Sequence, residues 1–326
     1  MKNLKRRILE AVSNDLEAIE KALTQNLEPY LSIVSHVAEY IIFGGGKRIR
    51  PLVMVLSARM CGYNGNNDKT LSIVFEYLHT ATLLHDDLVD GAEVRRGNPV
   101  AHSIWGNPAT VLVGDFLLAR SISIAAQTGL MPIIDVISRA TAQMSEGEIY
   151  QLLHRGDIAL SEEQYMELIE RKTAYLIQAA CQTGALLACA HEDRVQAMAQ
   201  YGNHLGYAFQ LVDDLLDYTA DAKVLGKAIG TDLKEGKLTL PLIYALNHAG
   251  SEDRSKMETI IGDDELKATE FNTIVDLVNK YDGIEYTRKL AKRHVNSAKE
   301  ALHLFDNSNT RTILEDLADY VLTRQM

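Results

Sequence analysis

Two acidic motifs with the same spacing are the residues best suited to do chemistry in this sequence. Residues 86–90 read Asp-Asp-Leu-Val-Asp, and residues 213–217 read Asp-Asp-Leu-Leu-Asp. On a helix that turns about 100° per residue, the three carboxylates of each motif share one face. The apolar residues around them indicate buried helices, where crowded carboxylates cost free energy unless a cation neutralises them. Carboxylate oxygens from two facing helices suit Mg²⁺, which keeps several waters and bridges to substrate phosphates.

A solvated helix end is the alternative interpretation of such a motif, and for a single copy it is an equal one. Two copies within apolar helices favour a metal site, because paired carboxylate motifs on facing bundle helices are a known way to bind metals. A calcium-binding loop does not fit, since neither motif has the glycine and the spaced ligands that such a loop requires.

Glycines and cations near the first acidic motif could bind phosphate. Residues 44–51 read Gly-Gly-Gly-Lys-Arg-Ile-Arg-Pro. The glycines let the backbone approach an anion, and Lys47 and Arg50 can donate charge-assisted hydrogen bonds. A glycine helix cap followed by surface cations explains this pattern equally well. Arg95 and Arg96 follow the motif after a short loop, where they can be counterions or can hold the phosphates that the metals bridge.

Other polar residues are aligned with the acidic faces. His79 lies two helical turns before the first motif, and Gln210 lies one turn before the second. Both are therefore expected on the metal side, although a lone helical histidine is usually structural. Lys172 and Thr173 interrupt a helix that is otherwise mostly apolar. The lysine-bearing loop at 225–237 is typical of a lid over anionic ligands, with a plain solvated loop as the alternative.

The elements that must position these residues are almost all helical. Pro is scarce, with 6 residues, and helix-forming residues dominate. Apolar residues recur with helical spacing in the ranges 4–24, 27–43, 51–61, 70–90, 108–128, 131–154, 161–190, 194–219, 238–249, 255–262, 268–281, 283–306 and 309–324. No stretch resembles an interdomain linker. We therefore expect one all-α domain over residues 1–326, a large single-domain helical bundle with the most apolar helices at its centre.

Composition and charge restrict the function classes. The chain has 326 residues, of which 47% are hydrophobic, and a net charge of −11, which argues against nucleic acid as a partner. Cys61, Cys181 and Cys189 are an odd number without metal-ligand spacing, so we expect small buried thiols in a reduced, cytoplasmic protein. No signal-peptide core follows the basic start and no run approaches membrane-spanning length, so we expect no transmembrane segment.

The motifs form one ordered series along the chain, at residues 45–51, 85–90, 95–97, 114–117, 172–173, 210–217, 226–227 and 237–241. Their order and spacing resemble those of the trans-polyprenyl diphosphate synthases over roughly residues 25–250. The resemblance implies an all-α, isoprenoid synthase-like fold. It also implies a homodimer, and two aspartate-rich motifs that face each other across a central cavity.

The resemblance also implies a role for each site residue. The residues expected to bind Mg²⁺ are Asp86, Asp87, Asp90, Asp213 and Asp217, with Asp214 as a weaker contributor. Those expected to contact the allylic diphosphate are Arg95, Lys172, Lys227 and Lys237. Those expected to hold isopentenyl diphosphate are Lys47, Arg50, His79 and Arg96. Thr173 and Gln210 would place dipoles beside a developing cation, so the expected catalytic residues are Lys172, Thr173 and Gln210.

The implied reaction is the Mg²⁺-dependent condensation of isopentenyl diphosphate onto an allylic diphosphate primer. Loss of the allylic diphosphate leaves a carbocation, so metals and cations that stabilise the leaving group would supply the catalysis. No side chain is an obvious general base, and the departing diphosphate would take the proton. The linear product would become a quinone side chain, with transient membrane contact at its release.

Product length depends on the residues just before the first acidic motif. Ala81 and Thr82 lie there and are both small. In the family, bulk at these positions stops the chain early, so their small size resembles long-chain synthases and we expect an octaprenyl product. The helix over 70–90 is about 30 Å long, enough for about six to nine isoprene units. The candidates for the floor of the tunnel are Phe75, Leu78, Met144 and Ile149.

Four other interpretations stay open. A short-chain farnesyl or geranylgeranyl synthase differs only in product length. A terpene cyclase of related fold normally carries an Asn/Ser/Glu motif in place of the second acidic motif. A non-catalytic subunit of a heteromeric synthase usually lacks some of the aspartates. A purely structural bundle leaves the buried acids unexplained. The C-terminal residues, where only Arg324 is basic, are left out of the site.

Overall fold

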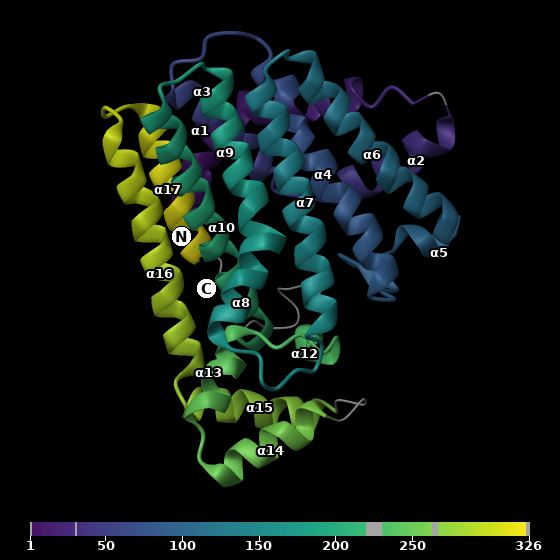
Figure 1. The fold of residues 1–326 in the computed structure, drawn as a ribbon, viewed down its shortest axis with the longest axis vertical. Helices are drawn as coiled ribbons and strands as arrows, with labels where there is room; N and C mark the ends of the chain where they lie inside the picture. The colour runs from purple at the N-terminus through teal and green to yellow at the C-terminus, as the bar shows by residue number, and fades with distance from the viewer. Residues whose placement is uncertain (1, 30, 220–229, 263–266, 324–326) are drawn as a thin grey trace. The chain divides into compact units, whose positions relative to one another are not determined.

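The computed structural model describes residues 2–29, 31–219, 230–262 and 267–323, which are almost entirely helical (Figure 1). The helices are α1 (Lys2–Gln25), α2 (Ser32–Phe43), α3 (Ile49–Met60), α4 (Asp68–Val89), α5 (Ala101–Trp105), α6 (Asn107–Gln127), α7 (Met131–Leu153), α8 (Glu162–Ile169), the π-helix η1 (Glu170–Ala174), α9 (Tyr175–Leu187), α10 (Glu192–Thr219), α12 (Thr231–Lys234), α13 (Leu240–His248), α14 (Ser251–Ile261), α15 (Ala268–Lys280), α16 (Gly283–Ala301), the 3₁₀-helix η2 (Leu302–Leu304) and α17 (Asn309–Thr323). The predicted all-α fold is confirmed.

The long helices match the sequence prediction, and the differences are confined to short elements. The predicted helix over 161–190 consists of α8, η1 and α9, with a π-helical turn in its middle. The loop over 91–99 contains a hairpin, in which β1 (Val94–Arg95) pairs antiparallel with β2 (Asn98–Pro99). Elements of two to five residues, including α5 and α12, are too short to show a hydrophobic period.

The described chain divides into two compact units. Unit 1 comprises Met1–Ala142, Leu176–Gly202 and Ala301–Asp316, and unit 2 comprises Gln143–Tyr175, Asn203–Glu300 and Leu317–Met326. The boundaries fall inside α7, α9, α10, α16 and α17, not in linkers. A single domain over the whole chain stays a prediction.

Helix α4 forms the centre of unit 1. It packs against α6, α3 and α1, and residues 71–78 are buried without exception. Helix α9 also comes close to α3, because a Cβ on Gly184 would lie 2.4 Å from the carbonyl oxygen of Met54. The first acidic motif therefore stands at the C-terminal end of the most deeply packed helix of its unit.

In unit 2, α16 is fixed at its start. Gly283 lies so close to α13 that a Cβ would come within 2.2 Å of the carbonyl oxygen of Pro241. One turn later, the Tyr286 ring stacks on Tyr244 with centroids 4.0 Å apart, and its hydroxyl donates to Glu162 at 2.6 Å. These contacts join α16 to α13 and α8, the helix that leads into η1.

A pair of histidines also lies inside unit 2. The Nδ1 atoms of His204 on α10 and His294 on α16 are 3.1 Å apart, and Tyr207 stacks on His294 with centroids 4.6 Å apart. Burial lowers the pKa of both rings, and together with the charge of His204 it brings the pKa of His294 to about 4. Both rings are therefore neutral at pH 7, and one proton between the two Nδ1 atoms satisfies the contact.

This pair predicts that acid weakens the fold. Between pH 6.5 and about 4, His294 is protonated in the unfolded chain but neutral in the folded one. The unfolding free energy therefore falls as pH falls, by at most about 1.4 kcal/mol per pH unit for one proton. Urea unfolding at several pH values should show this slope, and His294→Asn should flatten it. His191→Asn is the control, because the His191 side chain is 84% exposed. An equal slope in His294→Asn and wild type would contradict the assignment.

Two expectations from the sequence need correction. Helix α6 is long and apolar enough to cross a membrane by length and composition alone. In its most apolar stretch of 18 residues, 39% is buried. Core helices of soluble proteins share these properties. The expectation that no run approaches membrane-spanning length is therefore wrong. Cys61 and Cys181 are buried as predicted, but Cys189 is exposed, at a left-handed φ of 51° beyond the end of α9.

Candidate active site

The first acidic motif splits into one buried and two half-buried carboxylates. Asp87 is only 2% exposed, and the Arg95 side chain donates to it with Nε–O distances of 2.8 and 3.0 Å and an Nη2–Oδ1 distance of 2.7 Å. Asp86 and Asp90 are half-buried at the end of α4. Both oxygens of Asp87 are thus engaged by a guanidinium, and Asp86 and Asp90 are the more accessible carboxylates of the motif.

The glycine loop after α2 lies beside several of the predicted phosphate-binding cations. Gly45 has a φ of 111°, and a Cβ there would lie 3.7 Å from Nη1 of Arg96. Lys47 is exposed, and Arg50 is half-buried in the first turn of α3. Burial, followed by the charges of Arg50 and Arg96, lowers the pKa of His79 well below its usual value. His79 is therefore a neutral imidazole, able to donate from one nitrogen and accept at the other.

Arg48, which sequence analysis left out of the site, anchors this loop. It is 6% exposed and has a left-handed φ of 49°. Its guanidinium donates to Glu20 on α1 at 2.7 Å, to Glu76 on α4 at 2.6 Å and to the carbonyl oxygen of Ile42 at 2.6 Å. The loop is thereby tied to α1, to the end of α2 and to the helix that carries the first acidic motif.

Removing this anchor should be costly. Arg48→Met leaves Glu20 and Glu76 without their guanidinium, and breaking a buried ion pair from one side costs about 3–5 kcal/mol. Urea unfolding measures the loss. Arg59→Met is the matched control on α3, because the Arg59 side chain is 40% exposed against Asp15 and such pairs contribute about 0–1 kcal/mol. Equal losses in the two variants would mean that burial of Arg48 carries no special weight.

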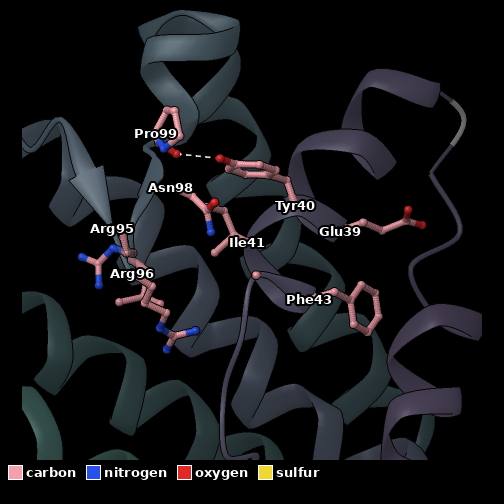
Figure 2. A pocket seen from close by; sticks show the side chains of 10 residues that line it. Glu39, Tyr40, Ile41, Phe43, Arg95, Arg96, Asn98 and Pro99 are labelled. Atoms are coloured by element: carbon pink, nitrogen blue, oxygen red, sulfur yellow. Dashed lines mark hydrogen bonds between the residues drawn. The ribbon is translucent and has the colours of Figure 1, made fainter. Parts of the chain in front are cut away.

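A pocket of about 300 Å³ separates the end of α2 from the hairpin (Figure 2). Arg95 and Arg96 line it from the hairpin side, and Tyr40 and Phe43 line it from α2. The Tyr40 hydroxyl donates to the carbonyl oxygen of Pro99 at 2.8 Å, a contact drawn in Figure 2. The hairpin is thus held to α2 at one end and, through Arg95, to α4 at the other, which fixes the two arginines.

The three carboxylates of the second acidic motif, on α10 in unit 2, differ in burial and in their hydrogen-bond partners. Asp213 is exposed. Asp217 is 7% exposed and accepts from the backbone N–H groups of Thr231 and Asp232, each at 3.2 Å. Asp214 is 2% exposed, and burial together with the nearby Asp232 carboxyl raises its pKa well above the usual value. The exposed Asp213 is the carboxylate best placed to meet a ligand.

The π-helical turn η1 presents Lys172 and Thr173. Lys172 donates to Glu148 on α7 at 2.7 Å, and Thr173 donates to the side-chain oxygen of Gln210 on α10 at 2.9 Å. Two glycines allow the backbone of η1 to lie close to the neighbouring helices α7 and α10. A Cβ on Gly147 would lie 2.8 Å from the Lys172 backbone nitrogen, and one on Gly206 would lie 2.4 Å from the Ala174 Cα. Single π-turns of this kind occur often at functional sites.

The remaining predicted residues are two lysines and the residues expected to set the product length. Lys237 donates to Glu235 at 2.6 Å, and Lys227 lies outside the described residues. Ala81 is 5% exposed, and Thr82 is half-buried with its hydroxyl donating to the carbonyl oxygen of His79 at 2.8 Å. Of the candidate floor residues, Phe75, Leu78 and Met144 are buried, whereas Ile149 is 57% exposed and does not lie in the interior of its unit.

The donor set fits Mg²⁺ bound largely through water and substrate. Among the described residues, no three His, Cys, Asp or Glu side chains converge closely enough to enclose an ion. Mg²⁺ does not need such a cage, since it keeps several waters and typically takes one or two carboxylates together with substrate phosphates. Asp86 and Asp90 offer carboxylates of this kind in unit 1, and Asp213 offers one in unit 2.

An all-α fold, two Asp-Asp-x-x-Asp motifs and several cationic side chains suited to binding diphosphate define the isoprenoid synthase class of enzymes. The polyprenyl synthetase family model matches residues 31–278, and the chain belongs to this family.

Individual relatives agree. The octaprenyl diphosphate synthase of Escherichia coli (strain K12) is 38% identical over 318 residues, which cover 98% of both chains. The all-trans-nonaprenyl-diphosphate synthase (geranyl-diphosphate specific) of Rhodobacter capsulatus is 35% identical and covers 99% of this chain and 98% of its own. A polyprenyl synthase from Caulobacter crescentus CB15, crystallised with calcium and isoprenyl diphosphate, superposes with a TM-score of 0.93 at 38% identity over 98% of both chains. The chain is therefore a trans-prenyltransferase that makes a prenyl diphosphate, and the reaction class predicted from the sequence is confirmed.

Proposed function

We propose that this enzyme is a long-chain synthase that extends an allylic diphosphate to octaprenyl diphosphate. The observation that carries the proposal is Ala81, a residue of minimal volume that is 5% exposed on the helix of the first acidic motif. A prenyl chain that grows along α4 would meet no bulky side chain there. Relatives named for octaprenyl and nonaprenyl products support a long-chain product.

The cations and carboxylates divide into two binding sets. The proposed ligands of Mg²⁺ are Asp86, Asp90, Asp213 and Asp217, while Asp87 orients Arg95. The groups proposed for the allylic diphosphate are Arg95, Lys172, Lys227 and Lys237, and those for isopentenyl diphosphate are Lys47, Arg50, His79 and Arg96. When bound, Mg²⁺ would neutralise charge on the diphosphate leaving group.

The side chains near the reacting carbons act through their dipoles. Lys172 would move from Glu148, its partner at 2.7 Å, to a diphosphate oxygen. A neutral His79 donates one hydrogen bond to isopentenyl diphosphate without adding positive charge beside the carbocation. Thr173 and Gln210 stabilise that cation with oxygen lone pairs, as fixed dipoles do in a site from which water is excluded.

We also propose a cytoplasmic homodimer that contacts membranes only to release its product, the precursor of a quinone side chain. Helix α6 supports the dimer, because Val111 is 40% exposed and Leu112 is 65% exposed on an apolar helix. Apolar side chains of this kind favour burial against a second copy. Sedimentation at micromolar concentration tests the proposal, and a monomer would overturn it.

Product sizing tests the proposed function. Purified enzyme, Mg²⁺, isopentenyl diphosphate and farnesyl diphosphate are incubated, and the dephosphorylated products are separated by reverse-phase chromatography. Octaprenol as the main product is expected, and chelation of Mg²⁺ should abolish it. Geranylgeraniol as the main product would overturn the long-chain assignment but leave the reaction class intact.

A further inference from the structure

Four side chains of unit 2 form one continuous hydrogen-bond chain. The Tyr165 hydroxyl on α8 donates to Oδ2 of Asp214. The Gln210 amide nitrogen donates to Oδ1 of Asp214 at 2.8 Å, and the Thr173 hydroxyl donates to the Gln210 amide oxygen at 2.9 Å. Tyr165 is 2% exposed, Asp214 is 2% exposed and Thr173 is 6% exposed, whereas Gln210 is half-buried, so the bond between Tyr165 and Asp214 is the one best shielded from water.

The chain has a fixed direction. The –NH₂ group of Gln210 faces Oδ1 of Asp214, and the Tyr165 hydroxyl occupies the other oxygen of the same side chain. The Gln210 oxygen then faces Thr173, whose single hydroxyl hydrogen is used in donating to it. Any group that approaches Thr173 Oγ1 from elsewhere therefore meets lone pairs and not a hydrogen.

We propose that Tyr165 and Asp214 are positioning residues that set the direction of the Thr173 and Gln210 dipoles. Without Asp214, the Gln210 amide can turn over and donate to Thr173, which frees the Thr173 hydrogen to point at the reacting carbons. A positive hydrogen beside a carbocation opposes the reaction, whereas a lone pair stabilises it. The inference rests on the proposed role of Thr173 and Gln210, and it assigns Asp214 an orienting task instead of metal binding.

A double-mutant cycle on turnover separates this role from metal binding. Thr173→Val removes the hydroxyl at nearly constant volume and should lower kcat by about 100-fold, the scale for loss of one oriented dipole. Asp214→Asn and Tyr165→Phe should lower kcat in wild type, yet change it by less than about threefold in the Thr173→Val background, because the dipole that they orient is gone. The Mg²⁺ concentration for half-maximal rate should stay unchanged in Asp214→Asn. Full additivity, or a raised Mg²⁺ requirement, would overturn the proposal.

A second cycle needs no substrate. The urea midpoints of Asp214→Asn, Thr173→Val and the double variant should be non-additive, since the residues share one chain. Thr287→Val is the control, because Thr287 is a fully buried threonine of the same unit that donates to Gly283 at 2.9 Å, and its effect should add to that of Asp214→Asn. If the midpoint shifts are non-additive but the protein has no prenyltransferase activity, the proposed function is refuted while the hydrogen-bond chain is supported. Additive midpoint shifts would refute the hydrogen-bond chain itself.

Discussion

Asp213→Ala should lower turnover at least about 1,000-fold, because a metal ligand that stabilises the leaving group contributes several kcal/mol and each 1.4 kcal/mol is tenfold in rate. Asp86→Ala should behave alike. Asp213 is exposed, so the urea midpoint of the variant should stay near that of wild type. Initial rates with saturating farnesyl and isopentenyl diphosphates measure the effect.

The control for this experiment is Asp276→Ala, which removes an exposed carboxylate from α15 in the same unit as Asp213. It should retain wild-type turnover. Near-normal rates in Asp213→Ala would remove this residue from the metal site, and near-normal rates in both acidic-motif variants would refute the Mg²⁺ assignment altogether.

Ala81→Tyr should move the main product from octaprenyl to about C15–C20. Ala81 is 5% exposed, so a tyrosine ring there must occupy interior space, and overpacking costs about 1–3 kcal/mol. A penalty of 1.4 kcal/mol at one elongation step already changes the partition between release and extension about tenfold. Early condensations should stay fast, because the acidic motif itself is unchanged. Reverse-phase separation of the dephosphorylated products measures the shift.

Ala11→Tyr is the control, since it adds the same ring to an exposed position of α1. It should leave product length unchanged. An Ala81→Tyr enzyme that still makes the wild-type product at a similar rate would mean that the prenyl chain does not pass Ala81.

The helices were predictable because each long one repeats its apolar residues with the helical period over many turns. Local regularity does not reveal the contacts between helices. Arg48 lies inside a motif of cations and looks like one more surface charge, but its partners Glu20 and Glu76 are on two other helices. No pattern in the sequence joins these three residues.

The site was predicted in outline, and the contacts among its residues were not. The acidic motifs predicted that all three carboxylates of the first face a metal, which stays a prediction, and they gave no sign of the contact between Asp87 and Arg95. Tyr165 was missed because its bond to Asp214 joins residues far apart in the sequence. A tyrosine in an amphipathic helix carries no sign that its hydroxyl has a buried partner.

The π-turn η1 has a consequence for how the sequence can change in length. It holds one residue more than an α-helical turn would, between Tyr165 on α8 and Thr173. A π-turn accommodates its extra residue within a single turn, so deleting one residue from 170–174 would let the segment relax into regular α-helix without turning Tyr165 away from Asp214. The backbone that presents Lys172 and Thr173 would be rebuilt, however, and the bond from Thr173 to Gln210 would be disturbed. A one-residue deletion here is therefore expected to preserve the fold and to lower activity.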